Sequence, residues 1–167
     1  MKRITGFAVL LLLATKSSFG QSITLAELIQ KTGCKNINCY KSYMRSKGFS
    51  LIKDTALPFY RTYMFQSEKP SRDSQAKLFY RSAISFYNDK SQVDVAIATF
   101  DKTIYESLVK EIEKSDFKKV VIPPSNEQTS TYYDRSTKNK KITLLLDVYT
   151  KENEPNRYSI TVSRHKR

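Results

Sequence analysis

Two cysteines five positions apart are the first residues of this chain that could carry chemistry. They lie in the stretch GCKNINCYKSYMRSKGF, residues 33–49. The C-x4-C spacing differs from the C-x-x-C of thiol oxidoreductases, where a helix N-terminus directly behind the motif activates the reactive thiol. A structural zinc site needs four ligands, whereas the chain offers Cys34, Cys39 and a single histidine, His165. In an oxidising compartment the default for the two cysteines is therefore a disulfide.

The geometry of such a disulfide constrains the local fold. In one continuous helix, residues five apart rise by about 7.5 Å and point to different sides. Cα atoms more than about 7 Å apart cannot be bridged without backbone movement. The helix must therefore break between the cysteines, where Gly33 and the asparagines Asn36 and Asn38 already indicate a break. We expect a bond that holds two short helices at a fixed angle and contributes about 2 kcal/mol on the chain-entropy model.

Residues suited to catalysis are few. Beyond residue 20 the only glycines are Gly33 and Gly48, so a phosphate-cradling loop or a dinucleotide fingerprint is excluded. His165 lies close to the C-terminus, where we expect poor order, which argues against a Ser-His-Asp or Cys-His site. Asp94 and Asp147 lie in mid-strand and could converge as an acid–base pair, although their alternation with apolar residues favours the wet face of a sheet. We predict a protein without catalytic activity, cofactor or metal.

The N-terminus has the layout of a secretory signal peptide. Lys2 and Arg3 precede a largely apolar core over residues 4–15, and small side chains stand at positions −3 and −1 of a cut before Gln21. The core is shorter than the roughly 20 residues of a membrane-spanning helix, and no later apolar run is long enough to span a bilayer. We expect residues 1–20 to be removed and the protein to be exported to the periplasm or the extracellular space. The alternative is an uncleaved N-terminal anchor.

The chain carries a formal net charge of +13. A balance of this size favours anionic partners such as acidic glycans, lipid head groups or nucleic acid. The charge also keeps an exported protein soluble without any such partner. The basic residues are scattered apart from clusters at 136–141 and 164–167, which an exposed hairpin tip and a fraying tail would explain equally well.

The elements that position these residues form a pattern in the first half of the chain. Thr24 and Glu27 have capping-box spacing at the start of TLAELIQK, and Gly33 can end that helix in the left-handed conformation. A second helix, capped by Asn36 or Asn38, ends at Gly48. Four strand-like runs follow, at residues 49–54, 59–66, 77–88 and 92–100.

The pattern then begins again. Asp101 can cap a helix over residues 102–115 whose Ile104, Leu108 and Ile112 face inward. Four more strand-like runs follow, at residues 116–122, 129–134, 140–150 and 157–164. Sliding the chain along itself so that Phe117 falls on Phe49 also aligns the helix stripes, with Ile112 on Met44, Leu108 on Tyr40 and Tyr105 on Ile37.

We therefore predict an α+β fold built from two tandem helix-plus-antiparallel-sheet repeats (α-ββββ) that share one core. Residues 21–100 form the first repeat, with a short helix pair, and residues 101–167 form the second. One helix on one small sheet buries little apolar area, whereas two such units side by side can share a core. The alternative is an ordinary α+β chain whose halves are alike only in layout.

Adjacent aromatic and arginine residues mark a candidate ligand face. In an alternating strand, one of two adjacent aromatics must face away from the core. Tyrosines exposed in this way beside arginines could stack on a glycan or anchor a protein partner. The alternative is that tyrosine is simply a good strand residue. The candidate residues are Tyr60, Arg61, Tyr63, Arg81, Tyr132, Tyr133 and Arg135.

The order of signal peptide, capped TLAELIQ helix, CKNINC and YKSYMRSKGF resembles uncharacterised exported proteins of the Bacteroidota over about thirty residues. The tandem layout with a short disulfide is similar to that of the beta-lactamase-inhibitor-protein group, although this chain lacks a second cysteine pair. Those proteins bind without catalysis, so the resemblance implies a binding role and transfers no particular target.

Two functions follow from the sequence. The first is a non-catalytic exported module that binds a protein or a cell-envelope component through the exposed face of its sheet. The second is a basic binder of anionic glycan, lipid or nucleic acid.

Overall fold

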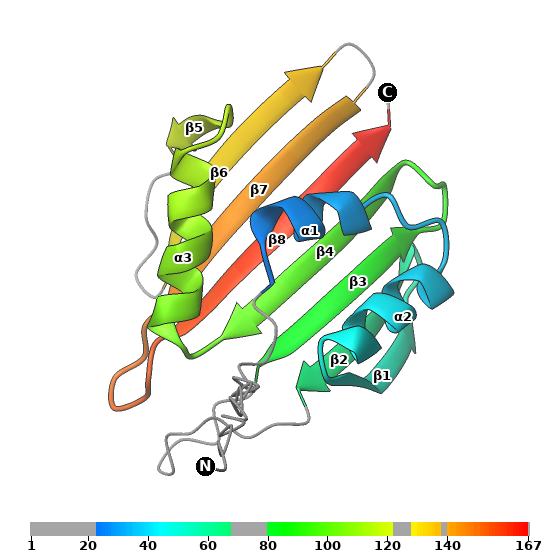
Figure 1. Cartoon of the computed structure of the whole chain (residues 1–167), viewed down its shortest axis with the longest axis horizontal. Coiled ribbons are helices and arrows are strands. Elements are labelled where there is room, and N and C mark those ends of the chain that lie inside the picture. The colour runs from blue at the N-terminus through cyan, green and yellow to red at the C-terminus, as the bar shows by residue number, and fades with distance from the viewer. Residues whose placement is uncertain (1–22, 68–79, 122–127, 138–139, 167) are drawn as a thin grey trace, which may run out of the picture.

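The computed structural model describes residues 23–67, 80–121, 128–137 and 140–166. In this part of the chain, eight strands form one antiparallel sheet and three helices lie across one of its faces (Figure 1). The expected signal peptide (1–20), the start of the run predicted at 77–88 and the end of the run predicted at 116–122 lie outside the described residues. The α+β class is confirmed.

The described chain contains three helices and eight strands. Their order is α1 (Leu25–Lys31), α2 (Ile37–Ser46), β1 (Phe49–Ala56), β2 (Tyr60–Ser67), β3 (Arg81–Tyr87), β4 (Gln92–Thr99), α3 (Lys102–Glu113), β5 (Lys118–Val121), β6 (Gln128–Thr137), β7 (Lys140–Tyr149) and β8 (Arg157–Lys166).

The strand order is β1-β2-β3-β4-β8-β7-β6-β5, and every neighbouring pair is antiparallel. The first four strands therefore stand in chain order and the last four in reverse order. They meet at the centre, where β4 pairs with β8 from Gln92↔His165 to Thr99↔Tyr158. The two edges are formed by β1, which has eight residues, and by β5, which has four.

The hydrophobic core lies between the helices and the sheet face beneath them. Strand residues alternate between the two faces, and in β7 this places Ile142, Leu144 and Leu146 under the helices. The helices contribute the stripes expected from their periodicity. The largest fully buried side chains are Tyr40, Phe65, Leu28, Met44, Ile84, Ile97, Leu108, Ile112, Leu144, Ile160, Val95 and Val162.

The helix starts agree with the sequence prediction. The Thr24 hydroxyl accepts a hydrogen bond from the backbone N–H of Glu27, and the Glu27 carboxylate accepts one from the backbone N–H of Thr24. Asn36 caps α2 and Asp101 caps α3 through their side-chain oxygens. These caps satisfy backbone donors that have no partner within the helix.

The role predicted for Gly33 was wrong. Among the described glycines, Gly48 has a positive φ, at 80°, whereas Gly33 does not, and α1 ends at a Thr32 cap in the right-handed conformation. A Cβ at position 33 would lie 3.0 Å from Arg164 Nη1 and 3.0 Å from Gln30 O. A side chain at position 33 would crowd the backbone carbonyl of Gln30 in the same turn and the Arg164 side chain of β8, whose Nη2 donates to Ile29 O at 3.0 Å.

The disulfide between Cys34 and Cys39 is present, and its Cα atoms are 5.7 Å apart. Cys34 lies in the turn after α1, and Cys39 lies in the first turn of α2. The helix is therefore broken between the cysteines, as the spacing predicted.

The outer strand β1 differs most from regular geometry. Its register against β2 shifts between Leu51 and Lys53, which marks a β-bulge. The strand and the turn after it also expose large apolar side chains, namely Leu51, Ile52, Leu57 and Phe59. In the described part of the chain, no helix has the length and apolar character needed to cross a membrane.

We expect the disulfide to stabilise the fold by restricting the unfolded chain. Replacing both cysteines by serine should lower the free energy of unfolding by about 2 kcal/mol on the chain-entropy model, measured by urea denaturation. Reductant should lower the stability of the wild type by a similar amount and leave the double variant unchanged. Equal midpoints for the wild type with and without reductant would contradict this.

A second prediction concerns the pH dependence contributed by Glu27, whose carboxylate lies 2.6 Å from Lys47 Nζ. Burial acts to raise its pKa, but the hydrogen bonds and charge of Lys47, together with the bonds from Thr24, outweigh burial and hold the pKa below its ordinary 4.5. A lowered pKa in the folded state means that the stabilisation is fully present above pH 4.5 and is lost as the pH falls through the folded-state value.

Glu27→Gln should therefore cost about 1–2 kcal/mol of unfolding free energy at pH 7 and flatten the pH dependence of stability below pH 5. Glu106→Gln, which removes an exposed i,i+4 pair with Lys102, is the matched control and should cost under about 0.5 kcal/mol. Denaturant titrations from pH 3 to pH 7 measure both effects. An unchanged pH profile for Glu27→Gln would count against this account.

Candidate functional site

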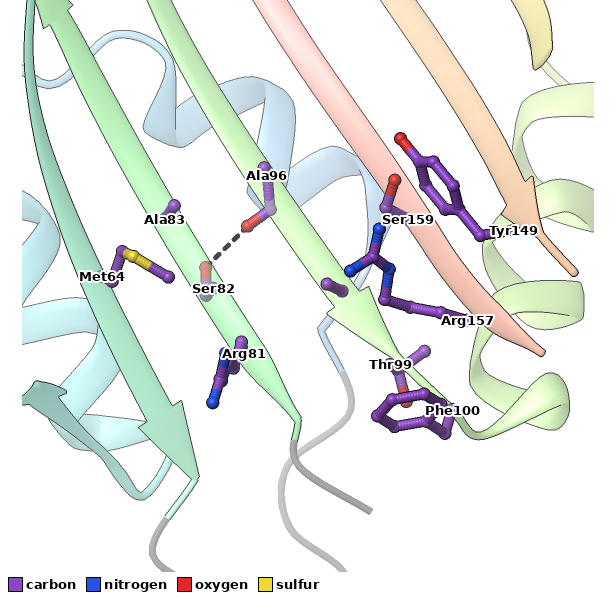
Figure 2. A pocket seen from close by; sticks show the side chains of 11 residues that line it. Met64, Arg81, Ser82, Ala83, Ala96, Thr99, Phe100, Tyr149, Arg157 and Ser159 are labelled. Carbon is purple, nitrogen blue, oxygen red and sulfur yellow. Dashed lines mark hydrogen bonds between the residues drawn. The ribbon is translucent and has the colours of Figure 1, made fainter. Parts of the chain in front are cut away.

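The face of the sheet that points away from the helices, here called the open face, carries the candidate site. Val95 and Ile97 lie under the helices, so the residues between and beside them, including Ala96 and Ala98, point to the open face. Figure 2 views the sheet from this side, with α1 behind the strands.

A groove of about 410 Å³ hollows the open face. Its floor consists of Ala83 on β3 and of Ala96 and Ala98 on β4, where Ala83 stands directly opposite Ala96. Met64 on β2 and Tyr149 on β7 lie on either side, and Phe100 lies at the end of β4 (Figure 2). Side chains stand roughly perpendicular to a sheet, so small residues on the central strands leave a hollow between larger neighbours.

The groove floor is connected to the helix layer through Ser82. The Ser82 side chain is buried on the helix face, where its Oγ donates to Ala96 O at 3.0 Å and lies 2.5 Å from the Tyr40 hydroxyl. Burial raises the pKa of Tyr40 above its ordinary value, so this hydroxyl stays protonated. The hydrogen bonds couple α2 to the two strands that carry the alanines.

Two arginines lie at the same end of the groove, at the starts of β3 and β8. The guanidinium of Arg157 lies over the ring of Tyr149, with Cζ 4.3 Å from the ring centroid. Figure 2 shows this guanidinium turned inward between β4 and β8, below Ser159. Arg81 lies on the other side of β4, opposite Ala98.

Asp147 lies beside the groove and is only 4% exposed. It accepts hydrogen bonds from Gln128 Nε2 at 2.6 Å and from Ser130 Oγ at 2.6 Å, and a longer one from Ser159 Oγ at 3.4 Å. Neutral donors on the two flanking strands, β6 and β8, thus surround this carboxylate. It faces away from the helices, as expected, but neighbouring side chains cover it.

The structure does not bring Asp94 and Asp147 together as an acid–base pair. Asp94 stands opposite Ser163 on β8, whereas Asp147 stands opposite Ser159, four residues along that strand. This separates the two residues by about 13 Å along the strands alone. Asp94 instead accepts hydrogen bonds from Gln92 at 2.7 Å and from the Tyr87 hydroxyl at 3.2 Å.

The environment of Tyr87 fits that of a neutral hydrogen-bond donor. Burial raises the pKa of its hydroxyl, and the negative charge of Asp94 raises it further. The hydroxyl therefore keeps its proton at neutral pH.

His165 lies within β8, between Gln92 and Lys141, so the expectation of poor order there was wrong. Its Nε2 lies 3.2 Å from Thr143 Oγ1. Within the described ranges, no group of three or more His, Cys, Asp or Glu side chains could hold a metal ion.

The seven tyrosines and arginines predicted as a ligand face lie on both faces of the sheet. By strand alternation, Tyr60, Arg81 and Tyr132 point to the open face. Tyr63 and Tyr133 pack against the core on the helix face. The structure therefore does not bring the whole set together, and Arg81 is the member that lines the groove.

The remaining two arginines are engaged on the helix side. Arg61 forms an ion pair with Asp54 at 2.7 Å. Arg135 pairs with Asp116 at 2.7 Å and lies over the ring of Phe117.

The sequence prediction missed the groove itself. Its residues come from strands far apart in the chain, and Arg157 follows a turn of otherwise ordinary composition. One signal was present, since the alternating alanines of VAIAT (95–99) predict a strand with small side chains on one face.

Comparisons with protein-family models, with curated proteins and with solved structures give no match for this chain. The resemblance drawn from the sequence therefore stays a prediction, and the open face provides the basis for proposing a function.

The buried carboxylate at the groove gives a testable prediction. Asp147→Asn should lower the free energy of unfolding by about 1–3 kcal/mol, because an amide NH₂ would then meet donors that now bind a carboxylate oxygen. Asp94→Asn is the matched control and should cost less, since its half-exposed carboxylate can exchange partners with water. Denaturant unfolding at pH 7 measures both, and equal losses would contradict the role given to Asp147.

Proposed function

We propose that this protein is an exported, non-catalytic binding module that recognises a protein or a cell-envelope component through the open face of its sheet. The observation that carries the proposal is the groove on that face, which has an alanine floor and a rim of Met64, Phe100, Tyr149 and Arg157.

The size and composition of the groove support binding. Its volume of about 410 Å³ falls in the range of roughly 300–1,000 Å³ that ligand sites occupy. Aromatic residues, methionine and arginine are enriched where proteins bind partners. The three helices pack on the other face of the sheet (Figure 1).

We infer that the fold arose from two α-ββββ repeats, residues 21–100 and 101–167. The alternation of helix and four strands supports this, as does the mirrored strand order around β4 and β8. The side chains aligned by the sequence shift are buried in both halves, namely Tyr40 with Leu108, Met44 with Ile112 and Phe49 with Phe117. On this view the groove spans the seam between the repeats.

Two observations support export of the protein. The first 20 residues have the layout of a signal peptide, and the Cys34–Cys39 disulfide is typical of oxidising compartments.

The alternative function, a basic binder of anionic glycan, lipid or nucleic acid, is favoured by one specific observation. Two arginines, Arg81 and Arg157, lie at the groove in a chain of net charge +13.

Filling the groove tests the proposed function. Ala96→Trp should place an indole over the floor and abolish retention of a component from a cell-envelope extract by the immobilised protein. Ser107→Trp adds the same side chain at an exposed position of α3 and should retain that component as the wild type does. Circular dichroism and thermal unfolding establish that both variants are folded. Retention of the same component by a folded Ala96→Trp variant would overturn the proposal.

A further inference from the structure

We infer that the groove binds an amphiphilic oxyanion, whose carboxylate or phosphate pairs with Arg157 and whose apolar body lies on the alanine floor. This inference rests on the proposed function, because it assigns a ligand class to the same groove.

The charge of Arg157 is the first argument. Its side chain is exposed, and in the described ranges no acidic residue forms an ion pair with it. The nearest candidate on the neighbouring strand is Asp147, whose oxygens already accept from Gln128, Ser130 and Ser159. In the described ranges both oxygens of this carboxylate thus accept from neutral donors, and no ion pair joins Asp147 to Arg157. An oxyanion in the groove would supply the missing partner.

The orientation of Arg157 is the second argument. Stacking on Tyr149, at 4.3 Å from the ring centroid, restrains the guanidinium and leaves its N–H edge available to a ligand. Figure 2 shows that edge turned toward the groove. A planar guanidinium binds carboxylate or phosphate through two parallel hydrogen bonds, and restraining it in advance reduces the entropy lost on binding.

The floor of the groove is the third argument, because it selects an apolar body. Ala83, Ala96 and Ala98 present methyl groups, and the sheet already uses their backbone N–H and C=O groups in its ladders. Met64 and Phe100 add further apolar surface. A polar ligand such as a sugar would lose water here without gaining hydrogen bonds.

The number of cations at the groove distinguishes an amphiphile from a polyanion. Nucleic acids and acidic glycans bind along rows of lysine and arginine that match a repeating charge. Here Arg157 and Arg81 stand at one end of the groove, and the rest of the floor is uncharged. This arrangement fits one anionic head group followed by an uncharged tail.

Titration with small probes tests the inference. Octanoate and octyl phosphate represent the two head groups, octanamide is the neutral match of octanoate, and inorganic phosphate is a head group without a tail. We expect both amphiphiles to shift the amide NMR signals of Ala83, Ala96, Ala98 and Ser159 in a saturable way. Octanamide and inorganic phosphate should each bind at least about tenfold more weakly, because each lacks one of the two interactions.

Variants of Arg157 test the contribution of its charge separately from that of its planar shape. Arg157→Gln should weaken binding of octanoate by at least about tenfold and leave binding of octanamide unchanged. Arg157→Lys should recover part of the loss, since it keeps the charge without the planar fork. Arg45→Gln, at an exposed position of α2 on the helix side, is the control for net charge and should bind octanoate as the wild type does.

Two outcomes would overturn the inference. The first is equal affinity of octanoate for the wild type and a folded Arg157→Gln variant. The second is equal affinity of the wild type for octanoate and octanamide, or for octyl phosphate and inorganic phosphate. If either occurs while Ala96→Trp still abolishes retention of the envelope component, the proposed function stands and only the ligand class fails. If Ala96→Trp retains that component and octanoate still binds through Arg157, the proposed function fails while the oxyanion site remains.

Discussion

The pairing of β4 with β8 is the contact on which the rest of the structure depends. Eight residue pairs, from Gln92↔His165 to Thr99↔Tyr158, join the first four strands to the last four. Because this pairing is antiparallel and in register, Ala96 and Ala98 stand beside Thr161 and Ser159 on the open face, and Ile97 stands beside Ile160 under the helices. One ladder of hydrogen bonds thus creates both the groove and the centre of the hydrophobic core.

The helix α1 consolidates this seam from the other side. Arg164 of β8 donates a hydrogen bond to Ile29 O at the end of α1, and Glu111 of α3 accepts one from the backbone N–H of Leu25 at its start. The disulfide fixes the turn between α1 and α2, and the Tyr40 hydroxyl of α2 reaches Ser82 on β3. The helix layer therefore braces the strands that carry the groove while leaving the opposite face open.

Local chemistry explains which features the sequence predicted. Capping at Thr24 and Asp101 depends on side chains within three residues of the backbone groups they satisfy, so their spacing was sufficient. The break between Cys34 and Cys39 followed from helix geometry alone. Alternation also placed Val95 and Ile97 in the core.

Features that depend on strand order and register escaped prediction. One of the two close contacts at Gly33 comes from Arg164, which lies far away in the chain, and no local pattern predicts that contact. The tyrosine and arginine set was predicted as a candidate face because one of two adjacent aromatics must point away from the core, but the sequence did not show which one. The register of the strands divides this set between the two faces of the sheet, with Tyr132 on the open face and Tyr133 in the core. The groove needed the pairing of β4 with β8 and so could not be derived from either half alone.

The bulge in β1 has a consequence for how this protein behaves at high concentration. An outermost strand with exposed apolar side chains is a template on which identical molecules can add to one another as a growing fibre. The register shift between Leu51 and Lys53 disrupts the even spacing of the backbone groups along that strand, and Lys53 adds a charge where a second molecule would approach. The irregularity therefore disfavours edge-to-edge pairing of two molecules at the strand that exposes the leucine and isoleucine side chains.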